Sequence, residues 1–112
     1  MKIISWNVRG RNGQLKRRLL KRKIRVEKLA IVFLQETKCS GEDLKNYSKF
    51  FWKGAETMAL DANGAIGGIG ILWNPNLVSL SNFVASKNMI SGHFHILGTI
   101  IRGVVTNVYG PF

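Results

Sequence analysis

The chain has 112 residues, enough for one small domain and too few for two cores of ordinary size. Its hydrophobic content of 46% excludes disorder as the default state. The net charge is +11, and residues 1–28 hold eleven of the 17 Lys and Arg residues against the single acid Glu27. This basic segment favours a polyanionic partner, nucleic acid before a membrane, because no long apolar span accompanies it. A solvated helix face is the plain alternative.

The cellular compartment follows from one cysteine and from the first residues. Cys39 is the only cysteine, so no internal disulfide can form and a reducing compartment is compatible. The N-terminus has one Lys and then a short apolar run that Trp6, Asn7 and Arg9 interrupt, which is not a secretory signal. We therefore expect a nuclear or cytoplasmic protein that is neither secreted nor bound to a membrane.

The first predicted elements are a strand and a basic helix. Residues 2–7 cluster apolar and β-branched side chains, which predicts a short, largely buried strand that ends before Gly10 and Gly13. Residues 14–29 predict a helix whose apolar stripe consists of Leu15, Leu19, Val26 and Leu29. Leu20 and Ile24 lie off this stripe, and the other positions are mainly basic.

A continuous apolar run follows the helix. Residues 30–35 are typical of a parallel strand buried on both faces, and the run ends at Glu36. A strand-helix-strand unit has a right-handed crossover and brings the carboxyl ends of both strands to one edge. The sequence therefore predicts that Asn7 and Glu36 lie at the same edge of a sheet.

The remaining chain predicts mainly strands. Residues 37–45 suit a surface loop with a helical turn, and Phe50, Phe51 and Trp52 suggest an aromatic strand. Further strands are expected at residues 68–73, 77–84, 92–101 and 104–109, with turns at 61–64, 74–76 and 102–103. The predicted fold class is α/β, with a mixed sheet covered by one basic helix.

Glu36 is the first candidate for chemistry. An unpaired carboxylate at the end of a buried strand is costly, and a hard divalent cation bound by carboxylates, waters and phosphate would stabilise it. The alternative is a salt bridge to Lys38 or to the basic helix. Asn7 ends the first strand, where its amide can orient a metal-bound water, although Asn at a strand end is also ordinary turn chemistry.

Tyr109 is the second candidate, because it ends a strand just before a Gly-Pro turn. Its phenol can donate to a phosphate oxygen, while a core aromatic is the rival interpretation. Asn107 projects to the same face of that strand, and no role is assigned to it. Five cations are candidates for contacts with a nucleic-acid backbone: Arg9, Arg11, Lys16, Arg17 and Arg18.

Two further patterns have plain structural interpretations. Residues 64–70 are rich in glycine but lack the Lys-Ser/Thr ending of a P-loop, so they indicate tight sheet geometry. His93 and His95 share one face of a strand and could bind a metal, but no third ligand lies near them in sequence. We interpret both as structural histidines.

Four blocks carry a resemblance to a known family: ISWNVRGR at residues 4–11, IVFLQETK at 31–38, GGIGILWNP at 67–75 and TNVYGP at 106–111. The chain resembles the endonuclease/exonuclease/phosphatase superfamily, and most of all the endonuclease domain of plant LINE-type (non-LTR) retrotransposons. The resemblance implies a four-layer, DNase-like α/β sandwich, Mg²⁺ or Mn²⁺ as cofactor and DNA as partner. It also implies that Glu36 is a metal ligand and that Asn7 and Tyr109 act at the reacting phosphate.

The resemblance extends over the first half of the family's domain. The later Asp-x-Asn block, a further metal-binding acid and the Ser-Asp-His block have no counterpart here. We therefore expect residues 1–112 to be a partial domain that exposes an apolar sheet face, self-associates through it and has little or no activity alone.

The leading hypothesis is a fragment of a Mg²⁺-dependent, phosphodiester-hydrolysing DNA endonuclease derived from a retrotransposon. One alternative is a non-catalytic basic module that binds nucleic acid through the first helix. Another is a degenerate gene remnant with no stable fold.

Overall fold

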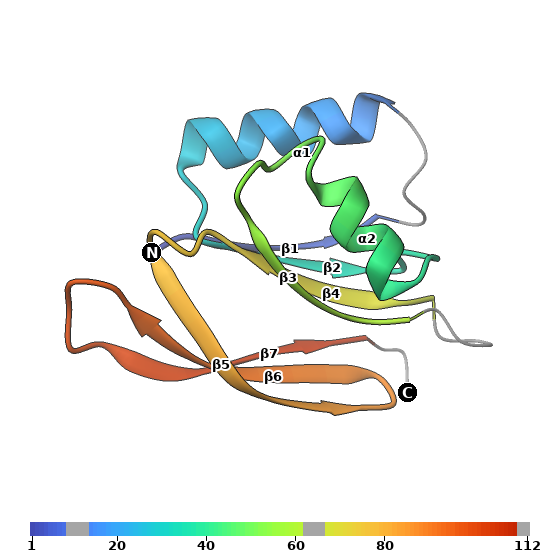
Figure 1. Cartoon of the computed structure of the whole chain (residues 1–112). Coiled ribbons are helices and arrows are strands. Elements are labelled where there is room, and N and C mark those ends of the chain that lie inside the picture. The colour runs from blue at the N-terminus through green and yellow to red at the C-terminus, as the bar shows by residue number, and fades with distance from the viewer. Residues whose placement is uncertain (9–13, 62–66, 110–112) are drawn as a thin grey trace.

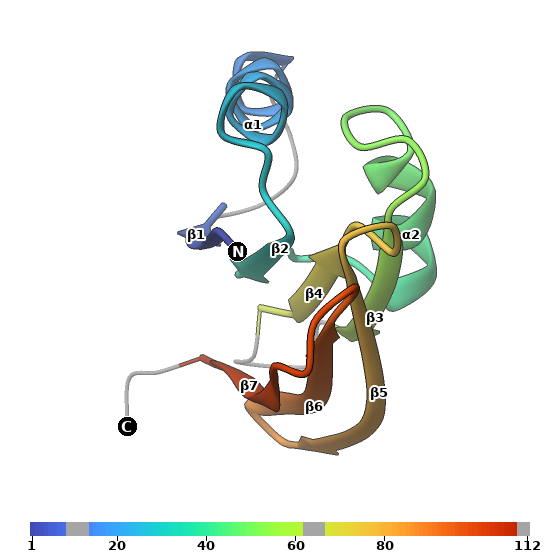
Figure 2. The same ribbon diagram turned by 90° about the vertical axis from the view of Figure 1, so that its left-hand side faces the viewer.

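The computed structural model describes residues 1–8, 14–61 and 67–109, and all statements below concern these residues. The elements in chain order are β1 (Ile3–Asn7), α1 (Gln14–Glu27), β2 (Ile31–Gln35), α2 (Gly41–Ser48), β3 (Glu56–Leu60), β4 (Ile69–Trp73), β5 (Val78–Ser86), β6 (Met89–Ile96) and β7 (Arg102–Val108). They form three layers: two helices, a four-stranded sheet and a three-stranded sheet (Figures 1 and 2). Neither helix in the described ranges is long and apolar enough to cross a membrane.

The four-stranded sheet has the order β1-β2-β4-β3. β1 and β2 are parallel while β4 is antiparallel to both of its neighbours, so the predicted mixed sheet is confirmed. β2 is central and buried on both faces: Val32 and Leu34 pack toward the helices, and Ile31 packs toward the second sheet. The continuous apolar run at 30–35 results from this double burial.

β1 differs from the prediction because it is an edge strand. Its residues alternate between exposed and half-buried, with Ile4 and Trp6 packed against the core and Ser5 and Asn7 exposed. Among the described strands only β2 pairs with it. The prediction of a largely buried strand was therefore wrong.

α1 buries the face that the sequence prediction left out. Leu20 and Ile24 are 3% and 8% exposed, whereas Leu19 and Val26 are 51% and 64% exposed. Leu20 and Ile24 are four residues apart, so they lie on the same side of the helix, about one turn from each other. The predicted stripe through Leu19 and Val26 was wrong, and the side chain of Leu15 lies outside the described part.

The end of α1 explains why the sequence pattern misled. Lys28 has a left-handed backbone (φ 51°), and the N–H of Leu29 donates to the carbonyl of Ile24 at 3.2 Å. This geometry is a Schellman-type helix ending, in which the residue after the turn packs back on the helix. Leu29 is buried for this reason and not because it continues a helical stripe.

α2 replaces the predicted loop, and the predicted aromatic strand does not exist. The Ser40 hydroxyl caps α2 by accepting from the N–H of Asp43 at 3.0 Å. Phe51 and Trp52 follow the helix in a turn, and their N–H groups both donate to the carbonyl of Ser48. The turn buries both rings in the helix-side core, and β3 then follows as an edge strand that the sequence did not predict.

The three-stranded sheet has the order β5-β6-β7 and is antiparallel throughout, as predicted. Arg102 and Gly103 were expected to form its last turn, but they lie inside β7. The turn lies at residues 97–101, where Gly98 supplies a positive φ of 79° and the N–H of Ile96 donates to the carbonyl of Ile101.

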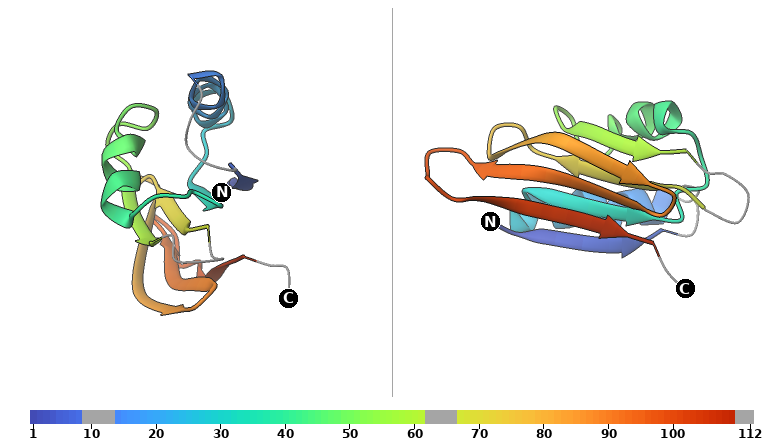
Figure 3. Two further views of the ribbon diagram at one scale, coloured as in Figure 1. Left: turned by 90° about the vertical axis from the view of Figure 1, so that its right-hand side faces the viewer. Right: turned by 90° about the horizontal axis from the view of Figure 1, so that it is seen from below.

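The two sheets pack face to face, and this corrects the expectation of an exposed sheet face. One apolar cluster joins Ile69, Ile71 and Trp73 of β4 to Val78, Leu80 and Ile90 of the second sheet. The face opposite the helices is therefore covered by β5–β7 within the chain itself (Figure 3). Self-association of the chain stays a prediction.

Two neighbouring leucines test the orientation of α1. We expect Leu20→Ala to lower the free energy of unfolding by about 2–4 kcal/mol, because it opens a cavity in the core. Leu19→Ala should cost less than about 1 kcal/mol, because more than half of that side chain is in solvent. Urea denaturation of both variants measures the difference, and equal losses would contradict the orientation.

Candidate active site

Three strands end on one side of the molecule and bring the sequence-predicted residues together. Asn7 is the last residue of β1 and lies opposite Gln35 in the parallel register, so Asn7 and Glu36 share one sheet edge. Tyr109 follows β7 of the other sheet (Figures 1 and 3). The predicted meeting of Asn7 and Glu36 at a carboxyl edge is confirmed.

Tyr109 and Glu36 are in direct contact across the two sheets. The Tyr109 phenol donates to Glu36 Oε1 at 2.8 Å, although the residues are 73 positions apart. This hydrogen bond raises the pKa of Tyr109 above its usual value, and desolvation and the negative charge of Glu36 act in the same direction. The phenol is therefore protonated at neutral pH and able to donate.

The backbone at Glu36 has a left-handed conformation (φ 55°), which is uncommon for a residue with a side chain. The main chain leaves β2 at Glu36. Directly after it, the N–H groups of Thr37 and Lys38 donate to the carbonyls of Gly68 and Gly67, respectively. A Cβ on Gly67 would lie 3.1 Å from the Cα of Glu36. Gly67 thus allows the close approach, as expected for tight sheet geometry, and residues 64–66 lie outside the described part.

The main chain of Tyr109 is fixed by Asn88, which the sequence prediction missed. The N–H of Tyr109 donates to the carbonyl of Asn88 at 2.8 Å, and Asn88 Nδ2 donates to the carbonyl of Tyr109 at 3.1 Å. Asn88 lies in the turn between β5 and β6. The phenol is therefore positioned by a hairpin of its own sheet.

A second set of missed residues lies directly behind the site. Gln35 Nε2 donates to Ser5 Oγ at 2.8 Å and to Asn107 Oδ1 at 2.7 Å. Asn107 is 1% exposed, and its Nδ2 donates to the carbonyls of Leu34 at 3.2 Å and Gly70 at 2.8 Å. This Ser5–Gln35–Asn107 network links the three strands that carry Asn7, Glu36 and Tyr109. The only sequence feature that pointed to this network was Asn107 itself, two residues before Tyr109 on the same face of the strand.

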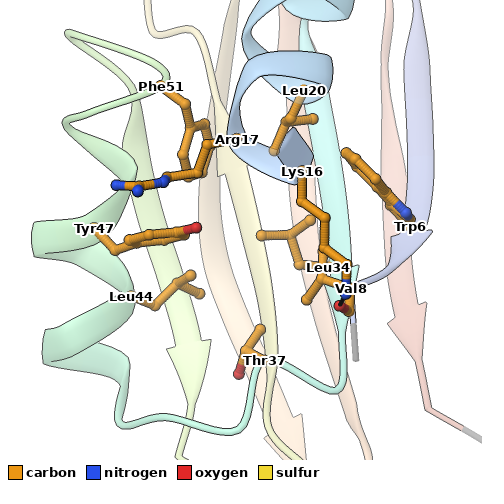
Figure 4. Close-up of a pocket in the computed structure, with 10 residues that line it drawn as sticks. All are labelled: Trp6, Val8, Lys16, Arg17, Leu20, Leu34, Thr37, Leu44, Tyr47 and Phe51. Carbon is orange, nitrogen blue, oxygen red and sulfur yellow. Dashed lines mark hydrogen bonds between the residues drawn. The ribbon is translucent and has the colours of Figure 1, made fainter. Parts of the chain in front are cut away.

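Two of the predicted phosphate-binding cations have partners within the fold. Lys16 Nζ donates to the carbonyl of Val8 at 2.6 Å, and the Arg17 guanidinium lies 5.5 Å from the centre of the Tyr47 ring (Figure 4). Arg18 is exposed. Arg9 and Arg11 lie outside the described residues.

Figure 4 shows a pocket between α1 and α2 that Lys16, Arg17 and Tyr47 help to line. Its interior is apolar, with Leu20 and Leu34 beneath, and its volume of ≈ 20 Å³ is about that of one water molecule. This volume is too small for a nucleotide.

His93 and His95 lie side by side on β6, as the sequence predicted. His95 Nε2 is 2.7 Å from the carbonyl of Thr99 in the adjoining turn, while His93 is exposed. Within residues 1–8, 14–61 and 67–109 no three His, Cys, Asp or Glu side chains are close enough to hold a metal ion together. The structural interpretation of both histidines stays a prediction.

The donors at the strand edge suit a hard cation better than a soft one. Glu36 contributes a half-buried carboxylate, and Asn7 adds an amide oxygen to the same edge. Mg²⁺ binds through one or two carboxylates and completes its shell with water and phosphate, whereas Zn²⁺ prefers three or four protein ligands of nitrogen or sulfur. The described residues therefore fit part of a site for a hard divalent cation.

Comparison with solved structures defines the class of fold. The catalytic domain of human Nocturnin aligns with a TM-score of 0.64 at 12% identity, over 90% of this chain and 46% of that chain. The AP endonuclease LMAP from Leishmania major gives 0.65 at 18% identity, over 96% and 39%. D. rerio TDP2 complexed with single strand DNA product gives 0.63 at 18% identity, over 93% and 44%. The fold is thus part of the DNase-like α/β sandwich that these enzymes share.

The family itself follows from the sequence. A model of the endonuclease/exonuclease/phosphatase family matches residues 4–111, nearly the whole chain, so this chain belongs to that family. No curated protein matches it. The chain spans less than half the length of each of the three structures above.

The contact between Tyr109 and Glu36 can be tested by titration in a Tyr47→Phe background, where Tyr109 is the only tyrosine. We expect Glu36→Gln to lower the Tyr109 pKa toward its usual value, measured by phenolate absorbance. The pKa of Tyr109 is higher in the folded chain than in the unfolded chain. The contact therefore stabilises the fold at pH values below the usual tyrosine pKa, and this stabilisation is lost as the pH rises through the pKa of the folded chain. Glu56→Gln, on the far edge strand, is the control, and an unchanged pKa in Glu36→Gln would contradict the contact.

Removal of the Asn107 amide tests the network behind the site. Asn107→Ala leaves Gln35 and two buried carbonyls short of a partner, so we expect a loss of about 2–4 kcal/mol in unfolding free energy. Asn46→Ala changes an exposed Asn on α2 and should shift it by less than about 0.5 kcal/mol. Thermal and urea unfolding measure both, and similar values would argue against the network.

Proposed function

We propose that this chain supplies the metal-binding and phosphate-contacting half of a phosphodiester-hydrolysing DNA endonuclease domain. The observation that carries the proposal is the contact between Tyr109 and Glu36, which places a hydrogen-bond donor beside a carboxylate at the end of β2. Phosphodiester hydrolysis needs a cation and donors at the same phosphate. Family membership over residues 4–111 supports the same chemistry.

Each residue has a defined task in this proposal. Glu36 would hold Mg²⁺ or Mn²⁺ through its carboxylate, and the cation would neutralise charge at the phosphate. The neutral Tyr109 phenol would turn its single O–H from Glu36 to a phosphate oxygen once the cation occupies the carboxylate. The Asn7 amide would orient water or phosphate at the same edge. Gln35 and Asn107 would hold the strands that carry these groups.

DNA is the proposed substrate, and a LINE-type retrotransposon of a plant is the proposed source. The blocks at residues 4–11, 31–38 and 106–111 support the source, since together they resemble that group of endonucleases. One of the similar structures is a TDP2 complexed with single strand DNA product, and another is an AP endonuclease, which supports a nucleic-acid substrate.

The chain alone is proposed to have weak activity or none. The described part of the chain brings two carboxylates to the strand edge: Glu36, and Asp61 after β3, whose Oδ1 accepts from the N–H of Gly41 at 2.6 Å. The chain spans less than half the length of the similar structures, so the remaining groups of the site would have to come from elsewhere. A non-catalytic DNA-binding module is the second candidate, and the exposed cations of α1 favour it. Both candidates predict DNA binding, but only the first predicts metal-dependent hydrolysis.

The test is nicking of supercoiled plasmid by the purified chain, with Mg²⁺ and with chelator. Any nicking by the chain alone is expected to be slow, to require Mg²⁺, to disappear in Glu36→Ala and to survive in Glu42→Ala, which changes an exposed acid of α2. Nicking that persists in Glu36→Ala or in chelator would overturn the assignment. Salt-sensitive DNA retention without any nicking would favour the binding module.

A further inference from the structure

We propose that the outer face of α1 binds the phosphate backbone of double-stranded DNA through Arg18, Lys21, Arg22 and Arg25, here named the α1 stripe. The choice of DNA as partner rests on the proposed function. The binding itself requires neither Glu36 nor a metal ion. It would be a second contact region, separate from the edge where Glu36 and Tyr109 meet.

Helix geometry places the four cations together. With 3.6 residues per turn, positions 18, 21, 22 and 25 fall within an arc of about 100°. All four residues are exposed, while Leu20 and Ile24 face the core from the other side of the helix. The burial of these two side chains fixes the rotation of α1 and so directs the stripe into solvent.

The charge of the stripe is not neutralised by neighbours. The single acid of α1, Glu27, pairs with Lys23 at 2.7 Å, and the hydrogen bond and charge of Lys23 lower the pKa of Glu27. In the described ranges, none of the four stripe residues takes part in an ion pair. Lys16 and Arg17, by contrast, are directed onto Val8 and Tyr47. The stripe therefore replaces them as the surface available to a polyanion.

The shape and chemistry of the stripe favour duplex DNA over a single strand. The helix rises about 10 Å from Arg18 to Arg25, and duplex DNA carries roughly six phosphates over that length. α1 contains no aromatic residue on which an unpaired base could stack. Contacts made only by Arg and Lys read the backbone and not the bases.

The position of α1 relates the stripe to the candidate active site. The helix begins on the side where β1, β2 and β7 end and runs from there toward the opposite side of the sheet (Figure 1). Arg18 is therefore the stripe residue nearest to the site edge, and Arg25 is the farthest. Duplex DNA on the stripe would extend away from the site edge along the helix layer.

Two sets of four substitutions test the proposal at equal net charge. The stripe variant is R18Q/K21Q/R22Q/R25Q, and the control variant is K45Q/K49Q/K53Q/K87Q, which removes four exposed cations elsewhere. Affinity for a fluorescent DNA duplex is measured over a series of salt concentrations in chelator. We expect the stripe variant to lose about tenfold or more in affinity, with a salt slope reduced by about two to four, and the control to change much less.

The outcomes separate this proposal from the proposed function. Equal losses in both variants would mean that net charge alone drives binding, and an unchanged stripe variant would also overturn the proposal. A failure of plasmid nicking leaves this binding result unaffected, because the binding is measured without metal.

Two further measurements complete the test. Vesicles of phosphatidylcholine and phosphatidylserine are compared with the duplex at the same salt, and stronger stripe-dependent retention on vesicles would assign the surface to a membrane. If the stripe variant does not fold by circular dichroism, NMR titration of the unaltered chain with the duplex decides. Shift changes along α1 would support the proposal, and changes confined to β5–β7 would overturn it.

Discussion

The carboxamide of Asn107 is the interaction on which the rest of the structure depends. It is buried between two sheets and bonds to β2 and β4 through the carbonyls of Leu34 and Gly70, and to the side chain of Gln35. Apolar packing between sheets has no fixed register, because the hydrophobic effect is not directional. Directional hydrogen bonds from one buried amide define how β7 lies on the other sheet. The distance between Glu36 and Tyr109 is set in this way.

Much of the fold was predictable because β2 and β4 are buried on both faces. Strands of this kind appear in the sequence as continuous apolar runs that end abruptly at a polar residue. The end of the first run located Glu36, and the parallel pairing located Asn7 beside it. The short helix α2 was predicted only as a helical turn within a loop, although Ser40 and Asp43 form a recognisable cap. The rotation of α1 was also mispredicted, since the Schellman-type ending buries Leu29 outside the helical period.

The contacts between distant segments were beyond sequence reasoning. Asn88 and Tyr109 are joined because β5, β6 and β7 form one sheet, and no local pattern reveals a partner 21 residues away. The inward direction of Lys16 was equally hidden, because Lys16, Arg17 and Arg18 look alike in the sequence. Their separation into buried-side and solvent-side groups needed the position of the core. Charge counts could indicate a polyanion but not the surface that meets it.

The backbone at Glu36 has a consequence for how this chain can change over time. A left-handed conformation costs a residue with a side chain roughly 1 kcal/mol or more, and glycine is spared that cost. The carboxylate is thus retained against a small conformational penalty. Glycine at position 36 would remove both the penalty and the carboxylate, whereas Lys28, Lys38 and Asn82 have the same left-handed backbone with other side chains.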